Sequence, residues 1–320
     1  MKKPINIENW EKIFCDYAIV DCAIREKNII YIQAVSSTDK PGMRQVTLVD
    51  LDNDETLAYS SIQFPSAFTS VLGTSTSPIS QGLLIDCLGG FALPSGGGKT
   101  SWDSETVARD TVAVIQKIKR IDGYAWAVGL RRFVSKRFNI GDWRPVMNGI
   151  SSGVAAANGS AFDYGFNDIA GFTENDIYAV GGQGDIWHFD GHVWQQCGFP
   201  TNDKLTNVVC ADDGFVYVAS RKRIWRGKLN KWESVDIPEL KGELNDLCWF
   251  NHALWGIGQH DFFSWASGTI NDYFICNGEQ IRPSGTMDCN DALLIIASYT
   301  NVWSFDGSEW YNTVPNYKNL

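Results

Sequence analysis

The stretch that decides the fold is DIYAVGGQGDIWHFDGHVW, residues 176–194. It contains an apolar strand of five residues, a glycine turn, a second strand that carries Trp187, an Asp190-Gly191 turn and a closing Trp194. An Asp-Gly pair between apolar runs favours a tight hairpin, because a type I′ turn needs positive φ at both central positions. The stretch therefore predicts antiparallel strands joined by short turns.

The same unit recurs along the chain. Its first strand matches the segments 125–129, 216–220, 254–258 and 294–298. The tryptophan of its second strand returns as Trp187, Trp225, Trp265 and Trp303. The closing tryptophan returns as Trp194, Trp232 and Trp310, while the unit around Trp265 lacks one. Two sets of tryptophans that keep step in this way indicate an internal repeat.

Weaker copies of the first strand occur at residues 28–34 and 82–88. Together the copies give seven units with strand centres near residues 30, 84, 127, 179, 218, 256 and 296. A period of about 40 residues with about four strands is typical of a β-propeller blade. We predict an all-β, seven-bladed β-propeller that forms a single domain over residues 1–320. Six blades are the alternative, if the N-terminal segment is not a blade.

Two segments stand outside this pattern. Trp10 resembles an outer-strand tryptophan with no blade before it, so we expect it to add a strand to the last blade and fasten the ring. Residues 104–119 are the best candidate for a helix, although their β-branched run at 111–115 favours a strand in the C-terminal half.

The composition narrows the classes of function. A net charge of -10 argues against direct binding to nucleic acid or to an anionic membrane. The N-terminus has no apolar run typical of a secretory signal, and no segment is apolar enough to span a bilayer. The eight scattered cysteines form no Cys-x-x-Cys pair and are interpreted as reduced, buried thiols. We therefore expect a cytoplasmic protein.

No motif for catalysis, metal binding or a cofactor fits its context. His188 and His192 flank a hairpin turn, where two polar cross-strand residues are a simpler interpretation than a metal site. The loop 95–100 lacks the spacing of a phosphate-binding loop. Residues 149–153 match Gly-x-Ser-x-Gly without the strand and helix that a nucleophile elbow needs. The sequence predicts no enzyme, no metal and no cofactor.

Short polar residues precede each expected inner strand and are the candidate partner-binding residues. They are Asp21, Asp168, Asn207, Asp246 and Asp288. At the rim of a central channel, they would form a negative funnel that attracts a basic protein. The alternative is that each caps a local turn. The basic run 216–232, with six bases and no acid, is interpreted as a salt-bridged strand surface.

The repeat resembles kelch and Asp-box blades and matches neither pattern. Gly181-Gly182 fits a kelch blade, but the other units lack the pair, and Asp306-Gly307 places glycine too early for an Asp-box. Over its whole length the chain is similar to degenerate bacterial propellers, in particular to propeller-type immunity proteins paired with nuclease effectors of type VI secretion systems. That resemblance implies a non-enzymatic protein that binds a basic toxin or effector domain and blocks its substrate site. The alternative is a carbohydrate-binding or glycan-cleaving propeller, in which tryptophans stack on sugars.

Overall fold

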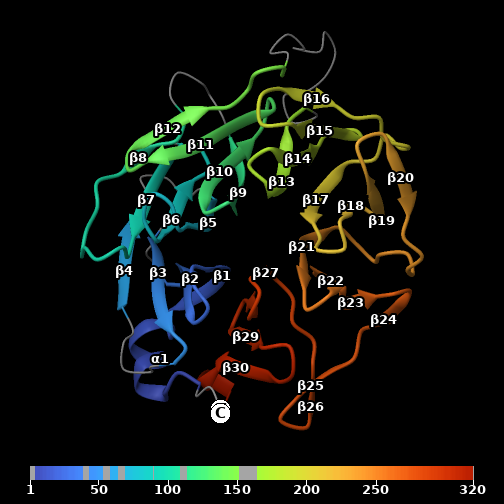
Figure 1. Ribbon diagram of the computed structural model, residues 1–320. Coiled ribbons are helices and arrows are strands. Elements are labelled where there is room, and N and C mark those ends of the chain that lie inside the picture. Colours follow the sequence, from blue (N-terminus) through green and yellow to red (C-terminus); the bar gives the residue numbers. More distant parts are fainter. Residues whose placement is uncertain are drawn as a thin grey trace.

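The computed structural model describes residues 4–38, 43–52, 58–63, 69–88, 90–108, 114–150 and 164–319, with residues 58–63 described by their backbone alone. Seven four-stranded antiparallel sheets are arranged radially around one axis (Figure 1). This confirms the all-β, seven-bladed β-propeller. No helix in the described part of the chain is long and apolar enough to cross a membrane.

Each blade takes four consecutive strands, with the first innermost. Blade 1 consists of β1 (Tyr17–Ile24), β2 (Ile29–Ser36), β3 (Met43–Asp50) and β4 (Ala58–Gln63). Blade 2 consists of β5 (Ser70–Ser75), β6 (Gln81–Asp86), β7 (Phe91–Ser95) and β8 (Glu105–Thr106). Blade 3 consists of β9 (Ile115–Ile121), β10 (Tyr124–Gly129), β11 (Phe133–Asn139) and β12 (Asp142–Pro145). Blades 4 and 5 are β13 (Phe166–Thr173), β14 (Asp176–Gly181), β15 (Asp185–Phe189) and β16 (Trp194–Gln196); and β17 (Leu205–Cys210), β18 (Val216–Ser220), β19 (Ile224–Lys228) and β20 (Lys231–Ser234).

The last two blades are separated by an extra hairpin. Blade 6 consists of β21 (Leu244–Phe250), β22 (Ala253–Gly258), β23 (Phe262–Ala266) and β24 (Thr269–Asn271). The hairpin of β25 (Phe274–Cys276) and β26 (Glu279–Ile281) follows as a sheet of its own. Blade 7 consists of β27 (Thr286–Cys289), β28 (Leu294–Ser298), β29 (Asn301–Phe305) and β30 (Trp310–Val314), before the short 3-10 helix η1 (Tyr317–Asn319).

The repeated apolar strand of the sequence is the second strand of each blade, not the innermost one. In β18, for example, all five residues are buried, because the strand lies between two others and between neighbouring blades. The first strands line the axis and carry polar residues, so their apolar pattern is weaker. The periodic tryptophans pack inside and between blades: Trp187 and Trp194 share one core cluster, and Trp265 lies in another.

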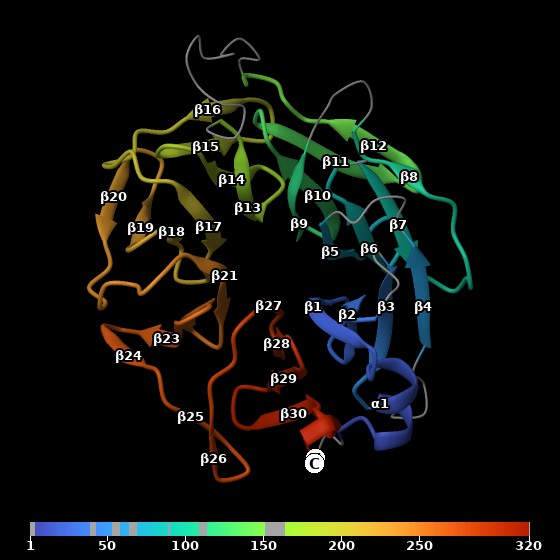
Figure 2. The same cartoon turned by 180° about the vertical axis from the view of Figure 1, so that it is seen from behind.

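The N-terminal segment fastens the ring in a different way from the one predicted. Trp10 lies in the helix α1 (Ile7–Ile13) rather than in a strand, and it packs edge-on against Tyr317 with ring centroids 5.7 Å apart. The backbone N–H of Ile5 donates to the carbonyl of Thr313 in blade 7 at 3.0 Å. Figure 2 shows α1 beside β30 from behind. Asn6 caps the helix with its side chain, which accepts from the N–H of Asn9 and makes a helix the better local choice.

The segment 104–119 contains no helix within its described residues. It supplies β8 and the start of β9, as the β-branched residues favoured, while residues 109–113 lie outside the described part. All eight cysteines are free thiols, and five of them are buried. Burial raises the pKa of Cys87 and that of Cys197 to about 11, so these thiols stay protonated.

Candidate functional site

Four of the predicted acids join neighbouring blades at the axis, three of them from an equivalent position. Asp168 accepts the N–H of Ile169 in its own strand at 2.9 Å and the N–H of Val208 in blade 5 at 3.0 Å. Asp21 does the same for Cys22 and for Leu72 of blade 2, each at 2.9 Å. These acids lie inside the first strand, directly after a β-bulge, and not before the strand as predicted. The bulge turns the carboxylate toward the next blade.

Asp246 occupies the corresponding position in blade 6. Its carboxylate accepts the N–H of Met287 in blade 7 at 3.1 Å. Asn207 holds the position in blade 5, and its Nδ2 donates to the carbonyl of Asn245 in blade 6 at 2.9 Å. In each of these blades the residue lies in the first strand directly after a β-bulge, and we call this shared place the ring position.

Asp288 does not share the ring position. In blade 7 the ring position belongs to Thr286, which lies opposite Ala297, the penultimate residue of the second strand. Asp288 lies two residues further along the first strand and pairs with Ile295. Asp288 accepts the N–H of Ile24 in blade 1 at 2.7 Å and so joins the last blade to the first. The sequence placed it in the wrong register because blade 7 has no bulge here and its first strand is two residues shorter than β17.

Blade 3 places a lysine at the ring position. Lys117 lies opposite Val128, as Asp168 lies opposite Val180 in blade 4. Its ammonium forms an ion pair with the carboxylate of Asp246 in blade 6, which is three blades away around the ring. Burial lowers the pKa of Lys117, but the nearby carboxylates, Asp246 first, outweigh burial and raise it. Lys117 therefore stays charged at the axis.

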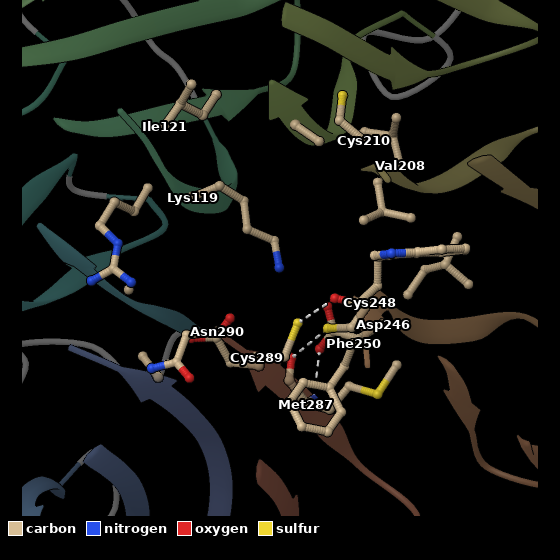
Figure 3. A pocket seen from close by; sticks show the side chains of 18 of the residues that line it. Lys119, Ile121, Val208, Cys210, Asp246, Cys248, Phe250, Met287, Cys289 and Asn290 are labelled. Carbon is tan, nitrogen blue, oxygen red and sulfur yellow. Dashed lines mark hydrogen bonds between the residues drawn. The ribbon is translucent and has the colours of Figure 1, made fainter. Parts of the chain in front are cut away.

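A cavity of about 600 Å³ extends along the axis from the ring position to the loops that join first and second strands. Asp21, Lys117 and Asp246 lie at its inner end, and Asp212 and Asp291 lie at the loops. In Figure 3 Lys119 reaches into the cavity from β9, with Asp246, Cys248 and Cys289 beyond its ammonium.

The pKa shifts in this cavity have one direction. Burial raises the pKa of Asp21 to about 6, although Lys117 and two backbone N–H groups oppose the rise. Burial lowers the pKa of Lys119, yet Asp246 and Asp168 outweigh it and raise that pKa well above its ordinary value. The rise at Asp21 follows from burial, whereas Lys117 and Lys119 hold their protons more tightly in spite of burial, which indicates a negative local potential.

Burial restricts which of the five predicted residues a partner can touch. Asp168, Asn207 and Asp246 are 1%, 3% and 1% exposed, whereas Asp21 and Asp288 are half-buried at the cavity. Contact of these five with a partner stays a prediction. Their negative potential at the cavity does not depend on such contact.

The charges of the blade loops separate by face. Because the strands of each blade are antiparallel, the loops from first to second and from third to fourth strands share one face, which we call the hairpin face. Among its described loop residues, eleven are Asp or Glu and three are Lys or Arg. The connections between strands on the opposite face carry six acids and eight bases in their described residues. The hairpin face is therefore acidic, whereas the opposite face carries nearly equal numbers of acids and bases.

Ion pairing strengthens this contrast. Of the hairpin-face acids, only Glu26, Glu174 and Asp212 form an ion pair with a described residue. On the opposite face Lys204 pairs with Glu243 at 3.1 Å and Lys222 with Glu239 at 2.6 Å. The basic run 216–232 is thus salt-bridged in part, as predicted, and Arg226 pairs with Glu233 in the same blade.

The residues considered for chemistry do not converge. His188 bonds Asp176 at 2.9 Å, and no group of three metal-ligating side chains occurs in the described ranges. In the loop 95–100 the three glycines have positive φ, and Lys99 lies over the ring of Trp102. Of residues 149–153, all but Gly149 and Ile150 lie outside the described part.

Comparison with known proteins gives a curated relative and a set of similar folds. The chain is similar to an immune protein. It is 34% identical over 191 residues to "Immune protein Tsi7" of Pseudomonas aeruginosa. The match covers 59% of this chain and 61% of the relative, so the chain spans less than two thirds of that protein's length. No protein-family model matches the chain.

Solved structures support the fold alone. Virginiamycin B lyase from Staphylococcus aureus has a TM-score of 0.66 at 12% identity and covers 92% of this chain and 94% of its own. The WD40 propeller domain of Doa1 has a TM-score of 0.62 at 10% identity, with 90% and 92% covered. A YCF48 protein bound to a D1 peptide also has a TM-score of 0.62, at 12% identity, with 94% and 93% covered.

Sequence reasoning missed Lys117, Lys119 and the acidic hairpin face. Aligning the hairpin turn 122–123 with the turn 174–175 places Lys117 one residue from the position of Asp168, and the extra residue of β13 between Gly171 and Thr173 accounts for that difference. The sequence did not reveal the hairpin face because its acids are spread over six of the seven blades, so a count of charges along the chain averages them with those of the opposite face.

Proposed function

We propose that this protein is a non-enzymatic immunity protein that binds a toxic effector and occludes its substrate site. The likeness to an immune protein over 191 residues carries the proposal. The effector class we favour is a nuclease delivered by a type VI secretion system, following the resemblance noted from the sequence. The free thiols support a cytoplasmic location, where thiols stay reduced.

The partner is a basic protein domain that approaches the hairpin face. Its unpaired acids and the negative cavity behind them would attract such a domain and speed its encounter. A surface that binds nucleic acid carries many lysines and arginines, so it complements this face. Direct contact by Asp21 and Asp288 belongs to the same proposal, with Asp168, Asn207 and Asp246 acting through their charge.

A test is co-expression with the toxin domain encoded beside the gene, which genome context identifies. We expect growth to be rescued by the wild-type protein and a stable complex to form from purified components. Failure of the wild-type protein both to bind that domain and to restore growth would refute the proposed function. The active-site residues of the toxin should become protected from proteolysis in the complex if occlusion is direct.

A further inference from the structure

The hairpin of β25 and β26 is an insertion between blades 6 and 7 with one buried and one exposed side. Asn277 and Gly278 form its turn, both with positive φ (52° and 85°), as a type I′ hairpin requires. Phe274, Cys276 and Ile281 are buried in the core shared by the two blades. Both views show the hairpin at the outer rim of the wheel (Figure 1, Figure 2).

The outward side of this hairpin is apolar where a solvated strand is ordinarily polar. Ile275 is 48% exposed and Tyr273, just before β25, is 58% exposed. Exposed isoleucine and tyrosine side chains on neighbouring positions are typical of anchor residues at protein interfaces.

A groove of about 650 Å³ separates this hairpin from β30 of blade 7. Ile275 and Cys276 form one wall, and Trp310, Tyr311 and Pro315 form the other. The thiol of Cys276 donates to the carbonyl of Trp310 at 3.2 Å and fixes the distance between the walls. Asn277 and Ser308 line the end of the groove at the hairpin face, so the groove continues the acidic surface over the rim.

The outer edge of β30 already accepts a strand-like segment. Among the described residues, β29 is the single strand that pairs with β30, and the N–H of Ile5 donates to Thr313 on the open side. Pro4, just before Ile5, lines the groove. Because the thiol of Cys276 bonds the carbonyl of Trp310 and the N–H of Ile5 bonds that of Thr313, the edge of β30 is largely engaged, so an occupant of the groove is held by side-chain contacts.

The negative charge at the groove favours a basic segment as its occupant. Glu309 is the charged residue among its described lining, and Asp306 lies in the same loop. Four hydrogen bonds, from Ser308, Glu309 and Tyr311, outweigh burial and hold the pKa of Asp306 at about 2, so it stays negative.

We propose that this groove binds an extended segment of the basic partner, with alternating apolar and basic residues, through side-chain contacts with its two walls. Apolar side chains of the segment pack on Ile275 and Pro315, and its basic side chains face Glu309. The inference rests on the proposed function only for the positive charge of the partner, and the probe peptides below test it without a toxin.

The test compares two synthetic peptides of equal charge, acetyl-(Lys-Val)4-amide and acetyl-(Lys-Gly)4-amide, by fluorescence anisotropy and by amide chemical shifts. We expect the valine peptide to bind about tenfold more tightly and to shift the amides of β25 and β30. Ile275→Asp should remove that preference, while Leu88→Asp, which adds the same charge at a residue 44% exposed in blade 2, should keep it.

Equal binding of the two peptides, a preference that survives Ile275→Asp, or shifts confined to the hairpin-face loops would each overturn the groove proposal. None of these results bears on toxin neutralisation, which is measured separately by co-expression. Thermal unfolding of both variants checks that they fold. The matching variant Ile275→Ser, which adds no charge, should weaken binding of the valine peptide in the same direction if packing in the groove is responsible.

Discussion

Lys117 of blade 3 and Asp246 of blade 6 form an ion pair across the axis of the wheel. The other ring-position contacts join a blade to its next neighbour, as Asp168 does with Val208. The side chains of Lys117 and Asp246 are 20% and 2% exposed, so the charges are largely removed from water. The pair therefore joins blades that the radial packing alone leaves independent.

Removing one charge of this pair should destabilise the protein. We expect Lys117→Met to lower the free energy of unfolding by about 3 kcal/mol, because Asp246 is left buried without its partner. The double variant Lys117→Met/Asp246→Asn should recover part of that loss. Urea unfolding of the two single variants and the double variant measures the coupling. Additive losses would show that the ion pair contributes nothing.

The raised pKa of Asp21 predicts a specific pH dependence. Its pKa is about 6 in the folded protein and about 3.9 when unfolded, so the folded state binds more protons between these values. Stability from this group is therefore present below about pH 4 and is lost as pH rises to about 6, by about 3 kcal/mol. Asp21→Asn should be less sensitive to pH over this range, as measured by urea unfolding at several pH values. An unchanged slope would contradict the shift.

Glycine ends the repeated strand at positions 181 and 129 because the neighbouring backbone leaves no room for a side chain. A Cβ on Gly181 would overlap the carbonyl oxygen of Gly165, and one on Gly129 would overlap that of Val114. We expect Gly181→Ala to destabilise the protein by about 3 kcal/mol, since backbone must move. Gly242→Ala, where a Cβ meets open space and φ is ordinary, is the control and should change stability by less than about 0.5 kcal/mol. Similar melting temperatures for both variants would refute this explanation.

These contacts also show what the sequence could predict. The repeated apolar strand predicted the number of blades and their second strands, because those strands are buried on both sides and read as apolar runs. The spacing of the tryptophans marked the third strands of four blades. The helix around Trp10 was missed because it is only seven residues long and depends on one capping residue, Asn6. The groove at β25 needs two segments that are brought together only by folding, Ile275 and Trp310, so no local pattern reports it.

The sequence predicted which residues lie at the axis better than it predicted their exposure and their partners. Asp21, Asp168, Asn207 and Asp246 do share one position at the axis, as their placement before apolar runs indicated. Their burial and the lysines opposite them depend on the width of the channel, which a sequence does not give. The separation of charge by face follows from strand direction, so it becomes visible only once every loop is assigned to a side.

The association rate with the toxin domain encoded beside the gene tests the central claim most directly. Asp103→Lys/Asp291→Lys reverses two exposed acids of the hairpin face, and Asp236→Lys/Asp272→Lys makes the same charge change on the opposite face. We predict that the first variant associates about tenfold more slowly at low salt and that the second stays within about twofold of the wild type. Equal rates for the two variants, or a larger loss for the second, would contradict an approach to the acidic hairpin face.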